Sequence, residues 1–267
     1  MIINKSNILF TLGYLKVRLR DFYYRNVKYP IKNNLSSNEK KIIDELFKKG
    51  IYMHENYWDE RKCNKVKNKL LEKINLLESN YDFPSGAYYR VNRKDAVHDV
   101  GVGRIYCPDK ELTELVGFKT DAWIKKIIEN YYGFSMYSVF TAFQYNKKCD
   151  IETRGFHIDG WTDEFKCFIY LDDVDISNGP FSYIKGSNNF YWQRFKRLIK
   201  DSSRNPDTSF ISLGGLMSRE EVCIAKKGTL IMVDVKGLHR GLPQLENNRS
   251  LVYNNFHPKN MQQYPEK

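Results

Sequence analysis

The sequence predicts an α+β domain with a mainly β core, in which an antiparallel double sheet or barrel carries helices on its outside. Three observations support this prediction. Apolar residues recur at helical spacing in several segments before residue 132, short β-rich runs dominate from Met136 onward, and turn residues separate the runs. Helices followed by many short strands are typical of this architecture rather than of alternating βαβ units.

The amino-terminal half contains the expected helices. The first covers residues 38–49 and is followed by a short strand over residues 51–54. Asp59 caps a second, longer helix whose apolar residues recur every three or four positions. Residues 81–118 show neither period, so we expect irregular binding loops there. A further helix begins at residue 120 or 121 and ends near residue 132.

The carboxy-terminal half contains the expected strands, at residues 138–145, 165–171, 181–185, 222–225, 229–235 and 250–256. Turn signals such as Asn178-Gly179-Pro180 and Lys227-Gly228 lie between them. We expect residues 35–267 to form one domain with an insertion at about 190–220, preceded by a basic arm over residues 1–34.

The composition indicates an ordinary globular protein in a reducing compartment. Of the 267 residues, 42% are hydrophobic and 28% charged, and no apolar run approaches the roughly 18 to 20 residues that a membrane span needs. The five cysteines are scattered without a C-x-x-C pair, which argues against a disulfide framework or a zinc knuckle. The start of the chain lacks the pattern of a secretory signal. We therefore expect a cytoplasmic location.

The basic arm carries much of the net charge. Residues 1–34 contain seven lysines and arginines against one aspartate, which is +6 of the total of +11. Within the arm Leu12, Leu15, Leu19 and Phe22 share one side of a helical wheel. The arm is thus a helix packed on its own domain, a loosely held segment, or a segment that contacts an anionic membrane surface or a partner.

A histidine and an aspartate stand two residues apart in the stretch Gly155-Phe156-His157-Ile158-Asp159-Gly160-Trp161. Side chains of an extended chain alternate between two sides, so His157 and Asp159 point the same way. An isolated H-x-D occurs often by chance, and a lone buried histidine is more often a core residue than a ligand. The pair needs partners before it indicates a site.

The partners follow eighty residues later. His239 comes directly behind the apolar run 229–235, and Arg249 stands at the head of the next expected strand. Two histidines and one carboxylate form the facial triad that holds non-haem Fe(II) and leaves coordination positions open. An arginine beside such a site binds a carboxylate of a co-substrate in bidentate fashion. The ordered set His157, Asp159, His239 and Arg249 therefore predicts a catalytic metal centre.

With these residues in view, most of the chain after residue 45 resembles the phytanoyl-CoA hydroxylase-like Fe(II)/2-oxoglutarate dioxygenases. The motifs that carry the resemblance are FKKGIY at 47–52, FIYLDD at 168–173, NGP at 178–180, KGSN at 185–188 and GTL at 228–230 leading to HRG at 239–241. Two features depart from the family pattern. Lys185 and Asn188 replace the usual proline and histidine of one turn, and the spacing of ten residues from His239 to Arg249 is slightly short.

The resemblance implies a double-stranded β-helix, or jelly-roll, core and a set of residue roles. His157, Asp159 and His239 would bind Fe(II), and Arg249 would bind the distal carboxylate of the co-substrate 2-oxoglutarate. Reaction with O2 would yield succinate and carbon dioxide and hydroxylate an unactivated C–H bond of a substrate. Because Asp159 is present, hydroxylation is favoured over chlorination.

Four further residues are candidates for binding roles. Gln144 and Tyr170 flank the H-x-D segment on neighbouring strands, where each is either a hydrogen-bond partner of the co-substrate or an ordinary strand residue. Arg104 is either a contact for an anionic substrate group or a solvated surface arginine. Trp161 either lines the substrate entrance or packs in the core.

Three functions remain open at this point. The first is a hydroxylase of a small molecule, lipid or sugar-lipid, with residues 1–34 as a peripheral membrane contact. The second is a nucleic-acid demethylase of the same chemistry, which the positive charge suggests. Arg249 has no second arginine nearby, which makes nucleic acid an unlikely partner. The third is a non-catalytic jelly-roll binding protein, against which the intact triad argues.

Overall fold

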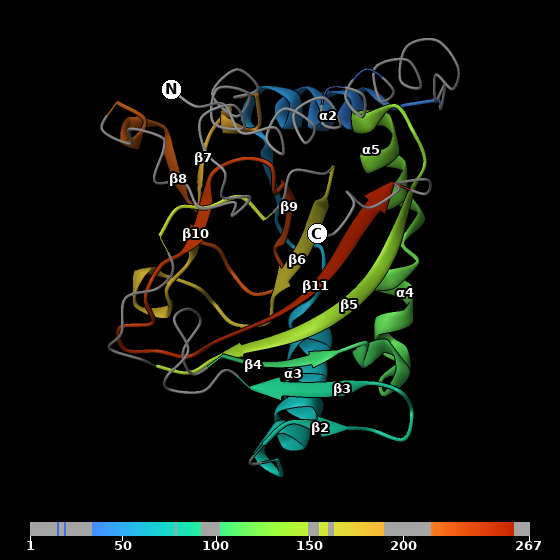
Figure 1. Cartoon of the computed structure of the whole chain (residues 1–267), viewed down its shortest axis with the longest axis vertical. Coiled ribbons are helices and arrows are strands. Elements are labelled where there is room, and N and C mark those ends of the chain that lie inside the picture. The colour runs from blue at the N-terminus through green and yellow to red at the C-terminus, as the bar shows by residue number, and fades with distance from the viewer. Residues whose placement is uncertain are drawn as a thin grey trace, which may run out of the picture.

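Two antiparallel sheets form the core of the protein in the computed structural model, which describes residues 15, 19, 34–77, 79–91, 102–148, 155–159, 163–189 and 215–258. The larger sheet has eight strands in the order β1-β9-β6-β11-β5-β4-β3-β2, and the smaller has three in the order β10-β7-β8 (Figure 1). The predicted jelly-roll core with flanking helices is confirmed.

The strands of the larger sheet are β1 (Ile51–His54), β2 (Tyr81–Asp82), β3 (Tyr88–Val91), β4 (Val102–Tyr106), β5 (Met136–Asn146), β6 (Phe165–Tyr170), β9 (Leu230–Asp234) and β11 (Arg249–Pro258). The strands of the smaller sheet are β7 (Phe181–Ile184), β8 (Glu220–Val222) and β10 (His239–Gly241). The pairings between the described strands are all antiparallel.

The helices of the described residues are α2 (Ser37–Lys49), α3 (Glu60–Asn75), α4 (Val116–Lys119) and α5 (Ala122–Tyr132), and capping side chains mark the start of α2, α3 and α5. Ser36 and Glu39 form a capping box at the start of α2, and Gly50 ends it at φ 80°. Asp59 accepts from the backbone N–H of Lys62 and caps α3 as the sequence predicts.

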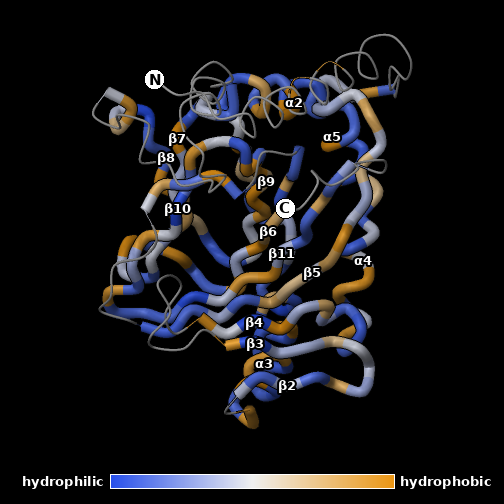
Figure 2. Tube along the Cα trace, viewed as in Figure 1, coloured by the Kyte–Doolittle hydropathy of each residue, from blue (hydrophilic) through white to orange (hydrophobic). Residues whose placement is uncertain are grey.

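The two faces of the larger sheet have different neighbours. On β6 the side chains of Phe165, Cys167 and Ile169 join the hydrophobic core shared with the helices. The alternate residues Lys166 and Phe168 face a cavity instead. The backbone trace is strongly apolar along β9, all five residues of which are buried (Figure 2). The larger sheet thus has one face in the hydrophobic core and the other face toward the cavity.

The prediction of irregular loops over residues 81–118 is wrong. The described part of this range holds β2, β3, β4, two short 3-10 turns and α4. These strands have two to five residues, which is too short for a period of two to show in the sequence. They extend the larger sheet because β4 pairs with β5, β3 with β4, and β2 with β3. The strand expected at 222–225 is also shifted, because β8 ends at Val222 and Ala225 makes only an isolated bridge to Val174.

Most of the basic arm and of the expected insertion lies outside the described residues. Within the arm, Leu15 and Leu19 are described as helical, and they are 38% and 69% exposed. Of the expected insertion at 190–220, the described part comprises residues 215–220, with a 3-10 turn over Met217–Arg219. Among the described residues, no helix has the length and apolar character that spanning a bilayer requires.

Candidate metal centre

Backbone hydrogen bonds place the two histidines side by side. His157 and His239 form an antiparallel bridge in which each backbone N–H donates to the carbonyl of the other at 2.9 Å. The N–H of Asp159 donates to the carbonyl of Val235 at 3.3 Å. The H-x-D segment therefore runs along the chain between β9 and β10, and His157 and His239, 82 positions apart in the sequence, become neighbours.

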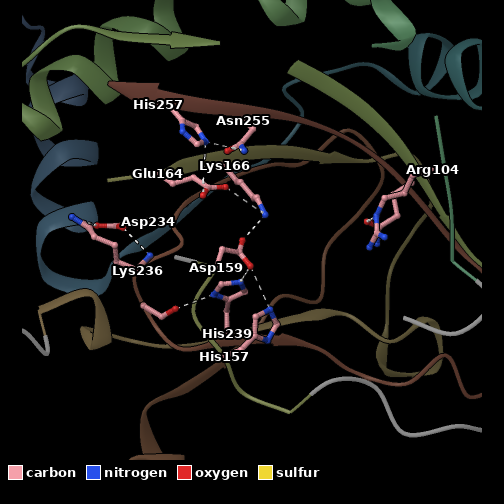
Figure 3. Close-up of polar contacts among 12 residues, drawn as sticks. Arg104, His157, Asp159, Glu164, Lys166, Asp234, Lys236, His239, Asn255 and His257 are labelled. Atoms are coloured by element: carbon pink, nitrogen blue, oxygen red, sulfur yellow. Dashed lines mark hydrogen bonds and ion pairs between the residues drawn. The ribbon is translucent and has the colours of Figure 1, made fainter. Parts of the chain in front are cut away.

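The three side chains converge on one point (Figure 3). Oδ1 of Asp159 lies 3.5 Å from Nε2 of His157 and 3.4 Å from Nε2 of His239. One ligand atom from each residue lies within 4.8 Å of the other two. The spacing is small enough for one ion to contact all three atoms, since bonds from these ligands to a divalent transition metal are about 2.0–2.2 Å long.

Both imidazoles are oriented as metal ligands. Nδ1 of His157 lies 3.0 Å from the carbonyl of Gly155, and Nδ1 of His239 lies 2.9 Å from the carbonyl of Gly237. A carbonyl only accepts, so each Nδ1 carries the proton and each Nε2 offers a lone pair toward Asp159. Burial also lowers the pKa of His157 and favours the neutral ring. This donor set fits a divalent transition metal with positions to spare.

A lysine that the sequence analysis missed contacts the carboxylate of the triad. Nζ of Lys166 donates to Oδ2 of Asp159, the oxygen that makes neither imidazole contact (Figure 3). Burial alone would raise the pKa of Asp159, but Lys166 and the two histidines hold that pKa well below its usual range. The available signal was a single charged residue in the otherwise apolar or aromatic run of β6, in register with Phe168 on the cavity face.

A cavity of about 430 Å³ opens beside the triad, between the two sheets. The larger sheet contributes side chains from β4, β5, β6, β9 and β11, and the smaller sheet contributes from β7 and β10. The residues that line the cavity include Arg104, Tyr106, Phe140, Gln144, Asn146, His157, Asp159, Lys166, His239, Arg240, Arg249 and Tyr253. The volume is in the range of pockets that hold small organic ligands.

Arg249 lies in the wall of this cavity. It is the first residue of β11, is 4% exposed, and its guanidinium donates to the carbonyl of Gly179. Tyr170 lies behind it, fully buried, and the Tyr170 hydroxyl accepts from the backbone N–H of Phe181 at 3.0 Å. Arg249 is therefore placed to meet a bound anion, whereas Tyr170 is placed to support this wall. Their co-substrate roles stay predictions.

Gln144 and Arg104 form another part of the wall. Nε of Arg104 donates to Oε1 of Gln144 at 2.8 Å, and the Gln144 amide donates to Asn146 at 2.8 Å. Arg104 lies well apart from the triad, across the open part of the site (Figure 3). The structure thus brings Gln144 to Arg104, away from the metal ligands. Trp161 lies outside the described residues.

A further histidine, His257, lies near the site. Nε2 of His257 is 3.8 Å from Oε2 of Glu164, a residue that lines the cavity. Oε1 of Glu164 is in turn 3.8 Å from Nζ of Lys166. His54, by contrast, packs against the rings of Tyr57 and Trp123.

Solved structures with the same fold include non-haem, alpha-ketoglutarate-dependent enzymes. The epimerase SnoN, in complex with Fe3+, alpha-ketoglutarate and nogalamycin RO, has a TM-score of 0.62 at 11% identity and covers 83% of this chain and 84% of its own. The alpha-ketoglutarate-dependent carbocyclase SnoK from nogalamycin biosynthesis scores 0.59 at 14% identity over 84% of both chains. HygX from Streptomyces hygroscopicus, with nickel and 2-oxoglutarate bound, scores 0.56 at 12% identity over 84% of this chain and 88% of its own.

These likenesses define the fold of this chain as the jelly roll found in 2-oxoglutarate-dependent enzymes. No family model and no curated relative matches the sequence. The narrower resemblance to the phytanoyl-CoA hydroxylase-like group therefore stays a prediction.

Proposed function

We propose that this protein is a non-haem Fe(II)- and 2-oxoglutarate-dependent oxygenase that hydroxylates a small organic molecule. The observation that carries the proposal is the meeting of His157, Asp159 and His239 with both Nε2 atoms 3.4–3.5 Å from one carboxylate oxygen. The fold shared with SnoN, SnoK and HygX supports it, because those enzymes bind or depend on 2-oxoglutarate.

Each residue of the site has a separate binding role. When bound, Fe(II) supplies the redox chemistry that couples oxidation of 2-oxoglutarate by O2 to oxidation of a substrate C–H bond. The two neutral imidazoles and Asp159 hold the metal, and Arg249 binds the distal carboxylate of 2-oxoglutarate. Burial of Arg249 keeps water away from this carboxylate and strengthens the contact.

The wall away from the metal is proposed to hold the substrate. Tyr106 and Phe140 pack ring to ring at 5.7 Å, and Phe140 packs on Tyr253 at 5.9 Å. Arg104 and Gln144 stand beside these rings in the same cavity. Aromatic faces with a few fixed polar groups are typical of sites for small organic ligands. HygX has been solved with hygromycin B bound and SnoN with nogalamycin RO, which supports a natural-product-like substrate.

Succinate formation tests the proposal directly. The full-length protein is incubated with Fe(II), 2-oxoglutarate and O2, both alone and with extracts of small molecules. Wild type should release succinate only with iron present, and a product one oxygen atom heavier than its precursor should appear in the extract. His157→Ala should abolish both, because it removes a metal ligand.

The matched control is His54→Ala, which removes a histidine that packs among aromatic rings and is not a lining residue of the described cavity. It should retain iron-dependent succinate release. The absence of iron-dependent succinate from folded wild type, or equal release from His157→Ala, would contradict the proposal.

Contact of residues 1–34 with a membrane and a cytoplasmic location stay predictions.

A further inference from the structure

The two carboxylate oxygens of Asp159 have different neighbours. Oδ1 faces both imidazoles, 3.5 Å from Nε2 of His157 and 3.4 Å from Nε2 of His239. Oδ2 is bonded to Nζ of Lys166 on the other side (Figure 3). The carboxylate is therefore divided between a metal-facing oxygen and a lysine-facing oxygen.

Lys166 is held by the centre of the larger sheet. It lies on β6, opposite Val233 of β9 on one side and Asn255 of β11 on the other. Its ammonium is also 3.8 Å from Oε1 of Glu164 and 5.9 Å from the centre of the Tyr253 ring. A lysine anchored in a strand with hydrogen-bonded neighbours on both sides approaches Asp159 from a fixed direction.

We propose that Lys166 is a positioning residue that keeps Oδ2 of Asp159 away from the metal, so that the carboxylate binds through Oδ1 alone. This inference rests on the proposed function. A carboxylate binds metals through one oxygen or through both. A protonated lysine has three donors and no acceptor, so it competes for Oδ2 without becoming a ligand itself.

The contact from Lys166 affects the coordination positions that the protein leaves open on the metal. A facial triad works because three protein atoms leave room for a chelating co-substrate and dioxygen. An Asp159 that binds through both oxygens would fill one of the positions that 2-oxoglutarate needs. Lys166 is therefore expected to favour co-substrate binding without contacting the co-substrate. A purely structural lysine would neutralise the carboxylate and leave the metal coordination unchanged.

The test uses Lys166→Met in the full chain, loaded with Co(II) in the absence of O2. Methionine has a similar length and no charge, so Oδ2 is released. The variant should still bind one Co(II) per chain, but its visible d–d bands should weaken as the coordination number rises. Its dissociation constant for 2-oxoglutarate, measured by calorimetry on the Co(II) protein, should increase about tenfold, the usual scale for loss of an outer-sphere partner.

Two variants control this experiment. Lys166→Arg keeps a cationic donor and should restore the wild-type spectrum and 2-oxoglutarate affinity in large part. Lys185→Met removes a lysine that pairs with Glu221 at 2.8 Å outside the described cavity lining, and it should behave as wild type. If Lys166→Met does not fold by circular dichroism, Lys166→Gln carries the same expectation, since an uncharged amide holds Oδ2 less firmly.

The outcomes separate this inference from the proposed function. An unchanged spectrum and unchanged 2-oxoglutarate affinity in folded Lys166→Met would overturn the role of Lys166 and leave the oxygenase proposal standing. Loss of Co(II) binding from that folded variant would also overturn it, because Lys166 would then serve to retain the metal. Failure of wild type to bind Co(II) or 2-oxoglutarate would contradict both the role of Lys166 and the oxygenase proposal.

Discussion

A histidine becomes a metal ligand through the bond that its other ring nitrogen makes. His157 and His239 each place Nδ1 against the carbonyl two residues earlier, at Gly155 and Gly237. The same local geometry therefore fixes the same tautomer twice. With both Nε2 lone pairs directed at Asp159, the site is arranged for a metal before one binds.

Two arginines in the cavity wall are expected to differ in their effect on 2-oxoglutarate. Arg249 is assigned to the distal carboxylate, whereas Arg240 is already paired with Glu220 at 2.9 Å. Arg249→Gln should raise the KM for 2-oxoglutarate about ten- to hundredfold, because a charge-assisted bond contributes about 1.5–3 kcal/mol. Steady-state succinate release at varied 2-oxoglutarate measures this change.

Arg240→Gln is the control for this assignment and should leave the KM for 2-oxoglutarate within about twofold of wild type, since its partner Glu220 lies outside the described lining. A larger effect at Arg240 than at Arg249 would mean that the wrong arginine has been assigned.

At the residue scale, the sequence predicted the three residues that meet in the candidate metal centre, but not the side chains around them. The H-x-D spacing puts His157 and Asp159 on one side of an extended chain, and the order of motifs suggested His239. The contact from Lys166 depends on strand pairing across the larger sheet, which no local period encodes. A lysine inside an apolar strand was the only hint.

The local sequence determines a helix or strand where its apolar period is long or its capping residue is clear. α2, α3 and α5 begin at the capping residues Ser36, Asp59 and Asp121, each of which accepts from the backbone of the first turn. The strands β5, β6, β9 and β11 alternate between the helix-facing core and the cavity. The short strands β2, β3 and β4 were missed because their pairing decides their structure.

A substitution in the turn before β9 tests whether the backbone geometry of that turn contributes to stability. Gly228 has φ +82°, and a Cβ there would lie 2.0 Å from the carbonyl oxygen of Trp58. The backbone of Gly228 also exchanges hydrogen bonds with Trp58 and Tyr170 at 3.0 and 2.8 Å. Gly228→Ala should therefore lower the free energy of unfolding by about 2–4 kcal/mol, measured by chemical denaturation.

Gly117→Ala is the matched control, because Gly117 lies in α4 and a Cβ there meets nothing within 4 Å. This change should stabilise the protein by about 0.5–1 kcal/mol, as alanine is the better helix former. Equal effects at the two glycines would show that the turn before β9 is not constrained.

On the scale of the whole molecule, a buried ionic network joins the helices to the strands around the site. Asp234 accepts from the hydroxyl of Tyr131 at 2.7 Å and lies 3.5 Å from Nζ of Lys236. Lys236 also pairs with Asp163, just past the H-x-D segment, and all three charged residues are at most 3% exposed. α5, β9 and the H-x-D segment are thus fixed to one another.

An antiparallel double sheet or barrel with outer helices was predictable from helices followed by short strands, and the motif resemblance implied the jelly roll. Structures only 11–14% identical share this fold. The substrate was not predictable, because it depends on cavity side chains from seven strands whose long-range pairing sets their positions. Fold alone does not determine function, so the site carries the functional claim.

The most direct test of the central claim is a titration of the metal-free protein with Fe(II) in the absence of O2, followed by calorimetry and thermal unfolding. A ligand that binds only the folded state stabilises it by about 2.7 kcal/mol at a hundred times its dissociation constant, which corresponds to a Tm rise of about 5–10 °C. Wild type should bind one Fe(II) per chain and show this rise, and His239→Ala should show neither. Equal stoichiometry and an equal Tm rise in His239→Ala would contradict the account.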